Sequence, residues 1–237
     1  MAGLTDKNIL VLGGSRGIGA AIVRRFAGDG GKVAFTYARS KDAAEALAVE
    51  TGSEAIETDS ANRDAVIATV AGRGPIDVLV INAGTGIIGD PLTLESDAVD
   101  RMIEINVHSP YHAAVEAARR MPDNGRIIVI GSINGDTMPF QGGAAYALTK
   151  SAVQGMVRGL ARDFGPRGIT VNSIQPGPVD TDMNPADGPM AEFMHGFMAI
   201  KRHIHADEVA ELTAFVAGPH GAMMTGAMHT IDGGFGA

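Results

Sequence analysis

The stretch LGGSRGIGAAI, residues 12–22, decides the fold of this chain. An apolar run at 8–12 precedes it and is typical of a buried β-strand, while apolar residues at helical spacing follow it. The glycines Gly13, Gly14, Gly17 and Gly19 lie between the two elements. Small residues let the loop turn sharply and let backbone N–H groups approach a pyrophosphate, which the helix N-terminus attracts. The stretch therefore predicts a nucleotide-binding loop, with a plain tight turn as the alternative.

Short apolar runs alternate with longer amphipathic segments along the rest of the chain. Strands that alternate with helices predict a parallel sheet with helices on both faces. We expect one α/β domain over 1–237, with a doubly wound sheet of about seven strands. The predicted strands lie near 8–14, 32–38, 55–56, 77–84, 126–132, 169–177 and 227–232. The predicted helices lie near 17–29, 41–51, 62–72, 96–121, 144–165 and 206–217, and residues 178–205 are expected to be irregular.

Composition and charge exclude several classes of function. A net charge of −8 argues against binding to nucleic acid or to an anionic membrane, both of which require a basic surface. The chain has no cysteine, which excludes disulfides and thiolate chemistry. No apolar run approaches the roughly 20 residues of a membrane span, and no charged-then-apolar leader precedes the first strand. We expect a soluble, cytoplasmic protein that binds no DNA, RNA or membrane.

The residues after the second predicted strand favour NADP(H) as the nucleotide. An NAD site usually has an acidic residue roughly 20 positions beyond the loop, where it binds the ribose 2′-hydroxyl. The segment FTYARSK, residues 35–41, has no acidic residue and contains Arg39, and Arg16 lies in the glycine loop. Two guanidinium groups would suit the additional phosphate of NADP. The alternative is that both arginines are ordinary surface charges.

A tyrosine and a lysine stand four positions apart in AAYALTK, residues 144–150, at the start of a predicted helix. Helical spacing places both side chains on one face. The same spacing occurs in YARSK, residues 37–41, so the spacing alone identifies nothing. Because Tyr37 ends a predicted strand, Lys41 is not on the same helical face. We interpret YARSK as part of the pocket for the adenosine phosphate.

The segment 144–150 suits acid–base chemistry on a carbonyl. The Lys150 cation would stabilise a Tyr146 phenolate, and Ser132, just beyond a predicted strand, would hydrogen-bond the same substrate oxygen. The carboxyl ends of the strands are also where open α/β sheets bind their ligands. The alternative is a packed tyrosine beside a solvated lysine and a serine in a turn.

The chain resembles the short-chain dehydrogenase/reductases across nearly its whole length. The matching residues are GGSRGIG (13–19), INAG (81–84), Asn106, Ser132, Tyr146-x-x-x-Lys150 and QPGPVDT (175–181). The resemblance implies a Rossmann-type fold and hydride transfer between NADP(H) and a small carbonyl or alcohol substrate, similar to that of 3-oxoacyl reductases. It also implies a homo-oligomer, a tetramer or a dimer, in which the helices at 96–121 and 144–165 pair between subunits.

The resemblance implies a role for each matching residue. Tyr146 matches the proton donor, and Lys150 matches the residue that binds the nicotinamide ribose and assists the tyrosine. Ser132 matches the group that hydrogen-bonds the substrate oxygen, and Asn106 matches the member that helps to hold a proton-relay water. The implied cofactor-binding residues are Gly13, Ser15, Arg16, Gly17, Ile18, Gly19, Arg39, Ser40, Asp59, Ser60, Asn82, Ala83, Gly84, Tyr146, Lys150, Pro176, Gly177, Val179 and Thr181, with Asp59 at the adenine edge.

The chain departs from the family pattern in three ways. Leu12 stands where the family loop usually opens with threonine, and Ile81 stands where asparagine is common. Both changes remove polar groups that brace the cofactor loop. The interval between Ser132 and Tyr146 is also about one residue longer than usual, so the segment between them must bulge for the two hydroxyl groups to converge.

Four stretches look more narrowly like a bacterial branch of the family that binds cyclic-di-GMP and mediates biofilm dispersal. These stretches are SRGIGAAIVRRF (15–26), SINGDTMP (132–139), ARDFGPRGIT (161–170) and GAMHTIDG (226–233). They imply a second hypothesis, in which the chain is a regulator that binds cyclic-di-GMP, with or without turnover of a substrate. No motif in the chain marks a cyclic-dinucleotide site.

Two other patterns have competing interpretations. Glu104, His108 and His112 fall at four-residue steps and could hold a metal ion, but no further ligand cluster accompanies them, so we expect an interface or solvated face and no metal. Several methionines lie near 180–205, among prolines and glycines. Because methionine adapts to varied shapes, they favour a mobile lid over an apolar substrate. Core filling or a subunit contact is the alternative for Met183, Met190, Met194 and Met198.

Overall fold

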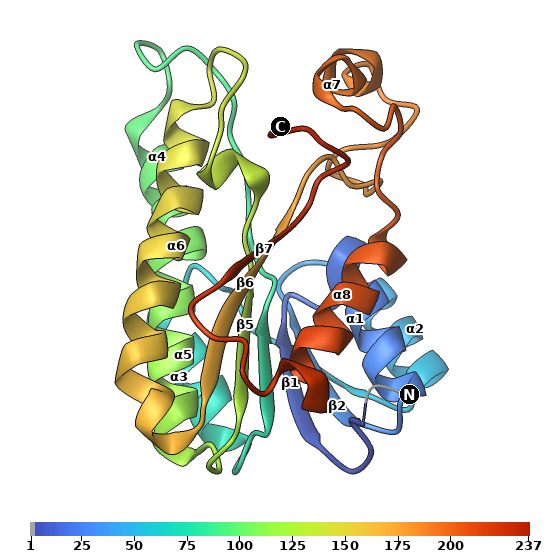
Figure 1. Cartoon of the computed structure of the whole chain (residues 1–237), viewed down its shortest axis with the longest axis vertical. Helices are drawn as coiled ribbons and strands as arrows, with labels where there is room; N and C mark the ends of the chain where they lie inside the picture. Colours follow the sequence, from blue (N-terminus) through green and yellow to red (C-terminus); the bar gives the residue numbers. More distant parts are fainter. Residues whose placement is uncertain (1–2) are drawn as a thin grey trace.

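The computed structural model, which describes residues 3–237, is a single parallel sheet with helices on both faces (Figure 1). The strand order is β3-β2-β1-β4-β5-β6-β7, and every pairing is parallel. The predicted doubly wound α/β fold of about seven strands is confirmed. The strands are β1 (Asn8–Leu12), β2 (Lys32–Tyr37), β3 (Glu54–Glu57), β4 (Val78–Ile81), β5 (Arg126–Ile130), β6 (Thr170–Pro176) and β7 (Met228–Ile231).

Eight α-helices connect and flank the strands within residues 3–237. None of the helices in this part of the chain combines the length and the apolar character that a membrane crossing requires. The helices are α1 (Gly17–Gly28), α2 (Lys41–Thr51), α3 (Arg63–Gly72), α4 (Ser96–Ile103), α5 (Ser109–Arg120), α6 (Ala144–Phe164), α7 (Ala191–Phe197) and α8 (Ala206–Ala217).

An apolar core on each face of the sheet holds the layers together. On one face α1, α2 and α8 cover the strands with side chains such as Ile22 and Val209. On the other face α3, α5 and α6 contribute side chains such as Val70 and Val157. Figure 1 shows these two groups of helices on opposite sides of the strands. The central strands are buried on both faces, which is why they are continuous apolar runs such as VLVI at 78–81.

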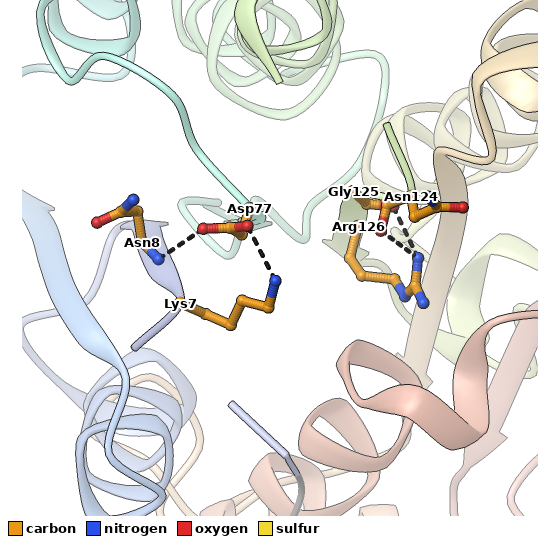
Figure 2. A network of polar contacts seen from close by, with 6 residues as sticks. All are labelled: Lys7, Asn8, Asp77, Asn124, Gly125 and Arg126. Atoms are coloured by element: carbon orange, nitrogen blue, oxygen red, sulfur yellow. Dashed lines mark hydrogen bonds and ion pairs between the residues drawn. The ribbon is translucent and has the colours of Figure 1, made fainter. Parts of the chain in front are cut away.

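Polar contacts join the amino ends of the central strands (Figure 2). The Asp77 carboxylate accepts hydrogen bonds from the Asn8 backbone N–H at 2.9 Å and from Lys7 Nζ at 3.1 Å. Arg126, at the start of β5, donates to the carbonyl oxygens of Asn124 and Gly125 at 2.7 and 3.0 Å. Burial lowers the pKa of the Arg126 guanidinium, because it disfavours the charged form. The Asp77 contacts tie the start of β1 to the residue before β4, whereas the Arg126 contacts stay within its own segment.

The carboxyl ends of the strands form a crevice where the strand order reverses. From β1 the chain passes through α1 to β2 on one side, whereas β4, on the other side of β1, begins the second half of the sheet. In open α/β sheets ligands bind at such a point, because the connections leave the two neighbouring strands in opposite directions. The glycine loop therefore lies at the position expected for a ligand.

The helix predicted over 96–121 is not one continuous α-helix in the structure. It consists of α4 and α5 joined by a π-helical segment, Glu104–His108. Within this segment the Ser109 N–H bonds to the carbonyl of Glu104, five residues back. Pro110 gives a physical reason, because it has no N–H for the Asn106 carbonyl that an α-helix would pair with it. The apolar periodicity of 96–121 indicated a helix correctly, but it did not reveal the change from α-helical to π-helical pitch.

The prediction that 178–205 is irregular was wrong for part of the segment. Residues Ala191–Phe197 form α7, which stands above the carboxyl ends of the strands at the top right of Figure 1. The helix has only seven residues and follows Pro189 closely, so its periodicity was too short to recognise. Two isolated bridges also order the segment, between Val179 and Ile204 and between Thr181 and Asn184.

Candidate functional site

A cavity of about 590 Å³ lies at the carboxyl edge of the sheet. The glycine loop, the ends of β2, β4, β5 and β6, and the start of α6 form its walls. Two predicted site residues, Gly19 and Asn106, do not line it. The predicted residues that do are Gly13, Ser15, Arg16, Gly17, Ile18, Arg39, Ser40, Asp59, Ser60, Asn82, Ala83, Gly84, Ser132, Tyr146, Lys150, Pro176, Gly177, Val179 and Thr181.

The glycine loop has a conformation that larger residues would prevent. Gly13 has a φ of +79°, and a Cβ there would stand 2.7 Å from the Ala83 backbone. A Cβ on Gly19 would stand 2.1 Å from the Gly13 carbonyl oxygen. The Thr36 hydroxyl accepts the Gly13 N–H at 2.8 Å, and Asn82 Nδ2 donates to the Gly13 carbonyl at 2.7 Å. The loop is therefore a close-packed cradle with both backbone groups of Gly13 bonded.

Sequence reasoning missed the bracing role of Thr36. Leu12, the departure from the family pattern, is 1% exposed and packs in the core, so it contributes no polar group to the loop. Thr36 is also 1% exposed, yet its hydroxyl and its carbonyl both bind the loop, the carbonyl through the Gly14 N–H at 2.8 Å. A single hydroxyl in the otherwise apolar run VAFT, residues 33–36, was the available signal.

The start of α1 is suited to an anion. The helix begins at Gly17, and no side chain caps its N-terminus. No acidic residue lies in its first turn. Unpaired N–H groups and the positive end of the helix dipole therefore lie beside Gly17 and Ile18, which line the cavity.

Two arginines, Arg16 and Arg39, lie at one end of the cavity. Arg39 is exposed, and Arg16 Nη1 lies 3.7 Å from Asp182 Oδ2 in a pair whose side chains are 63% and 74% exposed. So exposed an ion pair is weak, which leaves Arg16 able to bind another anion. The Ala61 backbone N–H, then Arg101 and Arg39, lower the pKa of Asp59, which lies on the same wall.

The predicted catalytic side chains meet at the other end of the cavity. Tyr146 and Lys150 lie one turn apart on α6, with Lys150 Nζ 5.7 Å from the centre of the Tyr146 ring. Lys150 is 8% exposed, and it donates to the Ile130 carbonyl at the end of β5 at 3.2 Å. Ser132 Oγ accepts the Asn134 N–H at 3.1 Å, which leaves the serine proton free to donate. The strand end and the helix together fix these groups.

Asn106 connects the loop after β4 with α6. Its Oδ1 accepts the Thr85 N–H at 2.9 Å, and its Nδ2 donates to the Thr85 carbonyl at 2.7 Å and to Thr149 Oγ1 at 3.0 Å. These hydrogen bonds occupy both the oxygen and the nitrogen of the Asn106 side-chain amide. Its backbone carbonyl lacks the α-helical donor because residue 110 is proline. The predicted part of Asn106 in holding a relay water stays a prediction.

An apolar wall closes the catalytic end of the cavity. Met194 and Phe235 line it, and Met198, which is 1% exposed, belongs to the same apolar cluster. The methionines therefore divide between the two interpretations, since Met198 fills a core and the others face the cavity or solvent. Phe235 comes from the segment after β7 and was not predicted. The apolar cluster contains Ile133, Met198 and Phe235, with Phe140, Met194 and Phe197 packed against it.

A histidine pair attaches α7 to the body of the protein. His195 Nε2 and His203 Nδ1 are 2.8 Å apart, and the two rings are nearly perpendicular. His203 is 3% exposed. Burial, and then the neighbouring His195, lower the pKa of His203, while Asp180 acts in the opposite direction. The folded protein therefore favours neutral His203.

We expect His203 to make the folded state less stable in mild acid. The unfolded state takes up a proton near the ordinary histidine pKa of about 6.5, while folded His203 stays neutral to lower pH. Between the lowered pKa of folded His203 and the ordinary histidine pKa, the unfolded state binds more protons than the folded state. The stability of the folded state therefore falls as the pH falls through this range. Thermal unfolding at about pH 7.5 and about pH 5.5 should show a smaller difference for His203→Gln than for the unsubstituted protein. An equal pH effect on the two proteins would contradict this role of His203. Burial also lowers the pKa of His229, but His229 is present in both proteins and cannot produce a difference between them.

The three candidate metal ligands have other partners in the structure. Glu104 and His108 pair with each other at 3.0 Å, and the His112 ring packs edge-on against Tyr111. Across residues 3–237, no group of three or more histidine, aspartate or glutamate side chains is arranged to hold a metal ion.

Comparison with known proteins gives extensive matches. A family model described as enoyl-(acyl carrier protein) reductase matches residues 13–236. The cyclic-di-GMP-binding biofilm dispersal mediator protein of Escherichia coli K12 is 63% identical over 237 residues, which cover all of both chains. The 3-oxoacyl-[acyl-carrier-protein] reductase MabA of Mycobacterium tuberculosis H37Rv is 35% identical over 234 residues, 98% of this chain and 93% of that protein.

A solved structure agrees closely with the fold. The crystal structure of BdcA in complex with NADPH superposes with a TM-score of 0.97 at 64% identity, covering 99% of this chain and 96% of that chain. The glycine loop and the tyrosine–lysine helix of this chain open on one cavity. Together with sequence identity of this extent, this arrangement shows that the protein belongs to the short-chain dehydrogenase/reductase family.

Proposed function

We propose that this protein is an NADPH-dependent oxidoreductase that reduces a carbonyl group to an alcohol, and catalyses the reverse reaction. The observation that carries the proposal is the shared cavity. One end of the cavity has the anion-binding loop with two arginines, and the other end has Ser132, Tyr146 and Lys150. Nucleotide binding and acid–base groups are thus placed for one reaction, which is the arrangement that hydride transfer requires.

The cradle fits a dinucleotide in which a phosphate replaces the ribose 2′-hydroxyl. The absence of a Cβ at Gly13 and Gly19 allows close approach of the backbone, and the uncapped start of α1 suits the pyrophosphate. Arg16 and Arg39 would hold the additional phosphate, since no acidic residue occupies 35–41. The NADPH present in the BdcA structure supports this assignment.

The catalytic side chains supply the proton. NADPH, when bound, provides the hydride. Tyr146 donates its phenolic proton to the oxygen of the carbonyl, and Ser132 donates a hydrogen bond to the same oxygen. Lys150, held near the ring by the Ile130 carbonyl, stabilises the phenolate that remains. In the reverse direction the phenolate accepts the proton of the alcohol.

The substrate is proposed to be a neutral carbonyl compound with an apolar group, of the 3-oxoacyl type. Met194 and Phe235 give the catalytic end of the cavity an apolar wall, which suits an acyl chain. The 3-oxoacyl reductase among the relatives supports this class. The test is NADPH consumption with a panel of carbonyl compounds that includes 3-oxoacyl thioesters. Absence of consumption with every member would contradict the proposal.

A second candidate function is the binding of cyclic-di-GMP in a role that promotes biofilm dispersal. The relative named for this property, at 63% identity over the full length, favours it. Calorimetric titration with cyclic-di-GMP, with and without NADPH, tests it. Competition between the two ligands would place both at the arginine end of the cavity. Absence of heat at high micromolar ligand would contradict this function and leave the oxidoreductase proposal intact.

The predicted assembly and location also belong to the proposal. Tyr111 on α5 and Leu148 on α6 are 48% and 58% exposed, which supports pairing of these helices between copies of the chain. A homo-oligomer should be detected by sedimentation, as a dimer or a tetramer. The cytoplasmic location stays a prediction.

A further inference from the structure

Three polar side chains beneath the catalytic end of the cavity form a closed ring of hydrogen bonds. Gln154 Nε2 donates to Asp136 Oδ1 at 2.7 Å and to Gln175 Oε1 at 2.9 Å. Gln175 Nε2 donates to Asp136 Oδ2 at 2.5 Å. Gln154 is 8% exposed and Gln175 is 0% exposed. None of the three lines the cavity, so the ring acts on the site only through the elements that carry it.

Each member of the ring belongs to a different wall of the site. Asp136 follows the turn Ile133–Gly135, which begins directly after Ser132. Gln154 lies on α6, one turn beyond Lys150. Gln175 lies near the end of β6, directly before Pro176 and Gly177, which line the cavity. The ring therefore ties the serine loop, the tyrosine–lysine helix and the proposed nicotinamide side together.

The loop that carries Asp136 is pressed closely onto α6. A Cβ on Gly135 would stand 2.8 Å from Gln154 Nε2 and 2.9 Å from the Lys150 carbonyl oxygen. The Ser151 hydroxyl also donates to the Gly135 carbonyl at 2.8 Å. This close approach lets the short Asp136 side chain reach two amide groups from two other elements.

We propose that Asp136 is a positioning residue, which holds Ser132 against Tyr146 and Lys150 by receiving hydrogen bonds from Gln154 and Gln175. The inference rests on the proposed reductase function. An ionised carboxylate only accepts hydrogen bonds, and here each oxygen receives one amide N–H. An asparagine in place of Asp136 would turn one amide group toward another amide group, donor against donor. The loop would then shift, and the serine hydroxyl with it.

The first test is Asp136→Asn. We expect kcat to fall by about 10- to 100-fold, because small displacements of positioned groups have effects of that size. NADPH affinity, measured by cofactor fluorescence, should be nearly unchanged, since no member of the ring lies on the glycine loop or beside Arg39. Asp123→Asn is the matched control. It also removes a carboxylate, one that pairs with Arg167 at 3.1 Å on an exposed surface, and its kcat should equal that of the unsubstituted protein.

The second test exchanges the two groups in the double variant Asp136→Asn/Gln175→Glu. The introduced asparagine would accept from Gln154 and donate to the introduced glutamate. Gln154 would still donate to that glutamate as well, so every bond of the ring has a matching partner. We expect kcat to return toward that of the unsubstituted protein. A loss that depends on a carboxylate at position 136 itself, and not on the pattern of donors and acceptors, would not be restored by this exchange. The double variant also provides the test if Asp136→Asn does not fold.

The outcomes separate this inference from the proposed function. If the unsubstituted protein consumes no NADPH with any carbonyl compound, the proposed function fails. If it turns over and Asp136→Asn has the same kcat, the positioning role is overturned. A folded double variant whose kcat stays low would also overturn it, because the pattern of donors and acceptors would then be intact.

Discussion

Tyr146→Phe is expected to lower kcat by about 10²- to 10⁴-fold, the usual contribution of general acid–base catalysis. The substitution removes one oxygen atom and keeps the ring that packs beside Gly86. NADPH affinity should be nearly intact, because the loop, the α1 N-terminus and the arginines lie at the other end of the cavity. Single-turnover measurement of NADPH oxidation, together with a fluorescence titration of NADPH, separates the chemical step from binding.

Tyr111→Phe is the matched control for this experiment. Tyr111 lies on α5, is 48% exposed and does not line the cavity, so its hydroxyl should not affect the rate. Tyr37 is unsuitable, because it lines the cavity. An unchanged kcat in Tyr146→Phe would rule out Tyr146 as the proton donor, whatever its position beside Lys150.

Arg39→Ala is expected to weaken NADPH binding by about 10- to 100-fold and to leave NADH binding unchanged. Hydrogen bonds to a charged group contribute about 1.5–3 kcal/mol, and only NADPH has the additional phosphate. Arg39 lines the cavity and is exposed, so its loss should disturb little else in the fold. Fluorescence titrations of both cofactors at one fixed ionic strength measure the effect.

Arg158→Ala is the control for charge. Arg158 is exposed on α6, away from the cavity, so its removal changes the net charge equally without affecting cofactor preference. If the unsubstituted protein binds NADH as tightly as NADPH, the assignment of Arg16 and Arg39 to the phosphate is wrong. If Arg39→Ala keeps the full preference for NADPH, the phosphate contact belongs to Arg16 or another group.

The sequence determined the fold and the location of the site, because both depend on local patterns. Alternating strands and helices gave the parallel sheet, and the strand–glycine–helix stretch gave the cradle at its carboxyl edge. The preference for NADP(H) followed from Arg16 in the glycine loop and Arg39 after the second strand, and it agrees with the NADPH bound in the BdcA structure. Spacing alone did not separate Tyr146 from Tyr37. The surrounding elements did, since Tyr37 ends β2 and Tyr146 lies in the first turn of α6.

The tertiary structure decided the features that depend on contacts between distant segments. Phe235, in the last segment, reaches the cavity near Met194, and Thr36 braces a loop more than twenty positions before it. The π-helical segment and α7 are too short to leave a periodic signal. The ring of Asp136, Gln154 and Gln175 joins residues up to 39 positions apart. Sequence patterns record which face of an element is buried, whereas only packing decides which element from elsewhere in the chain meets that face.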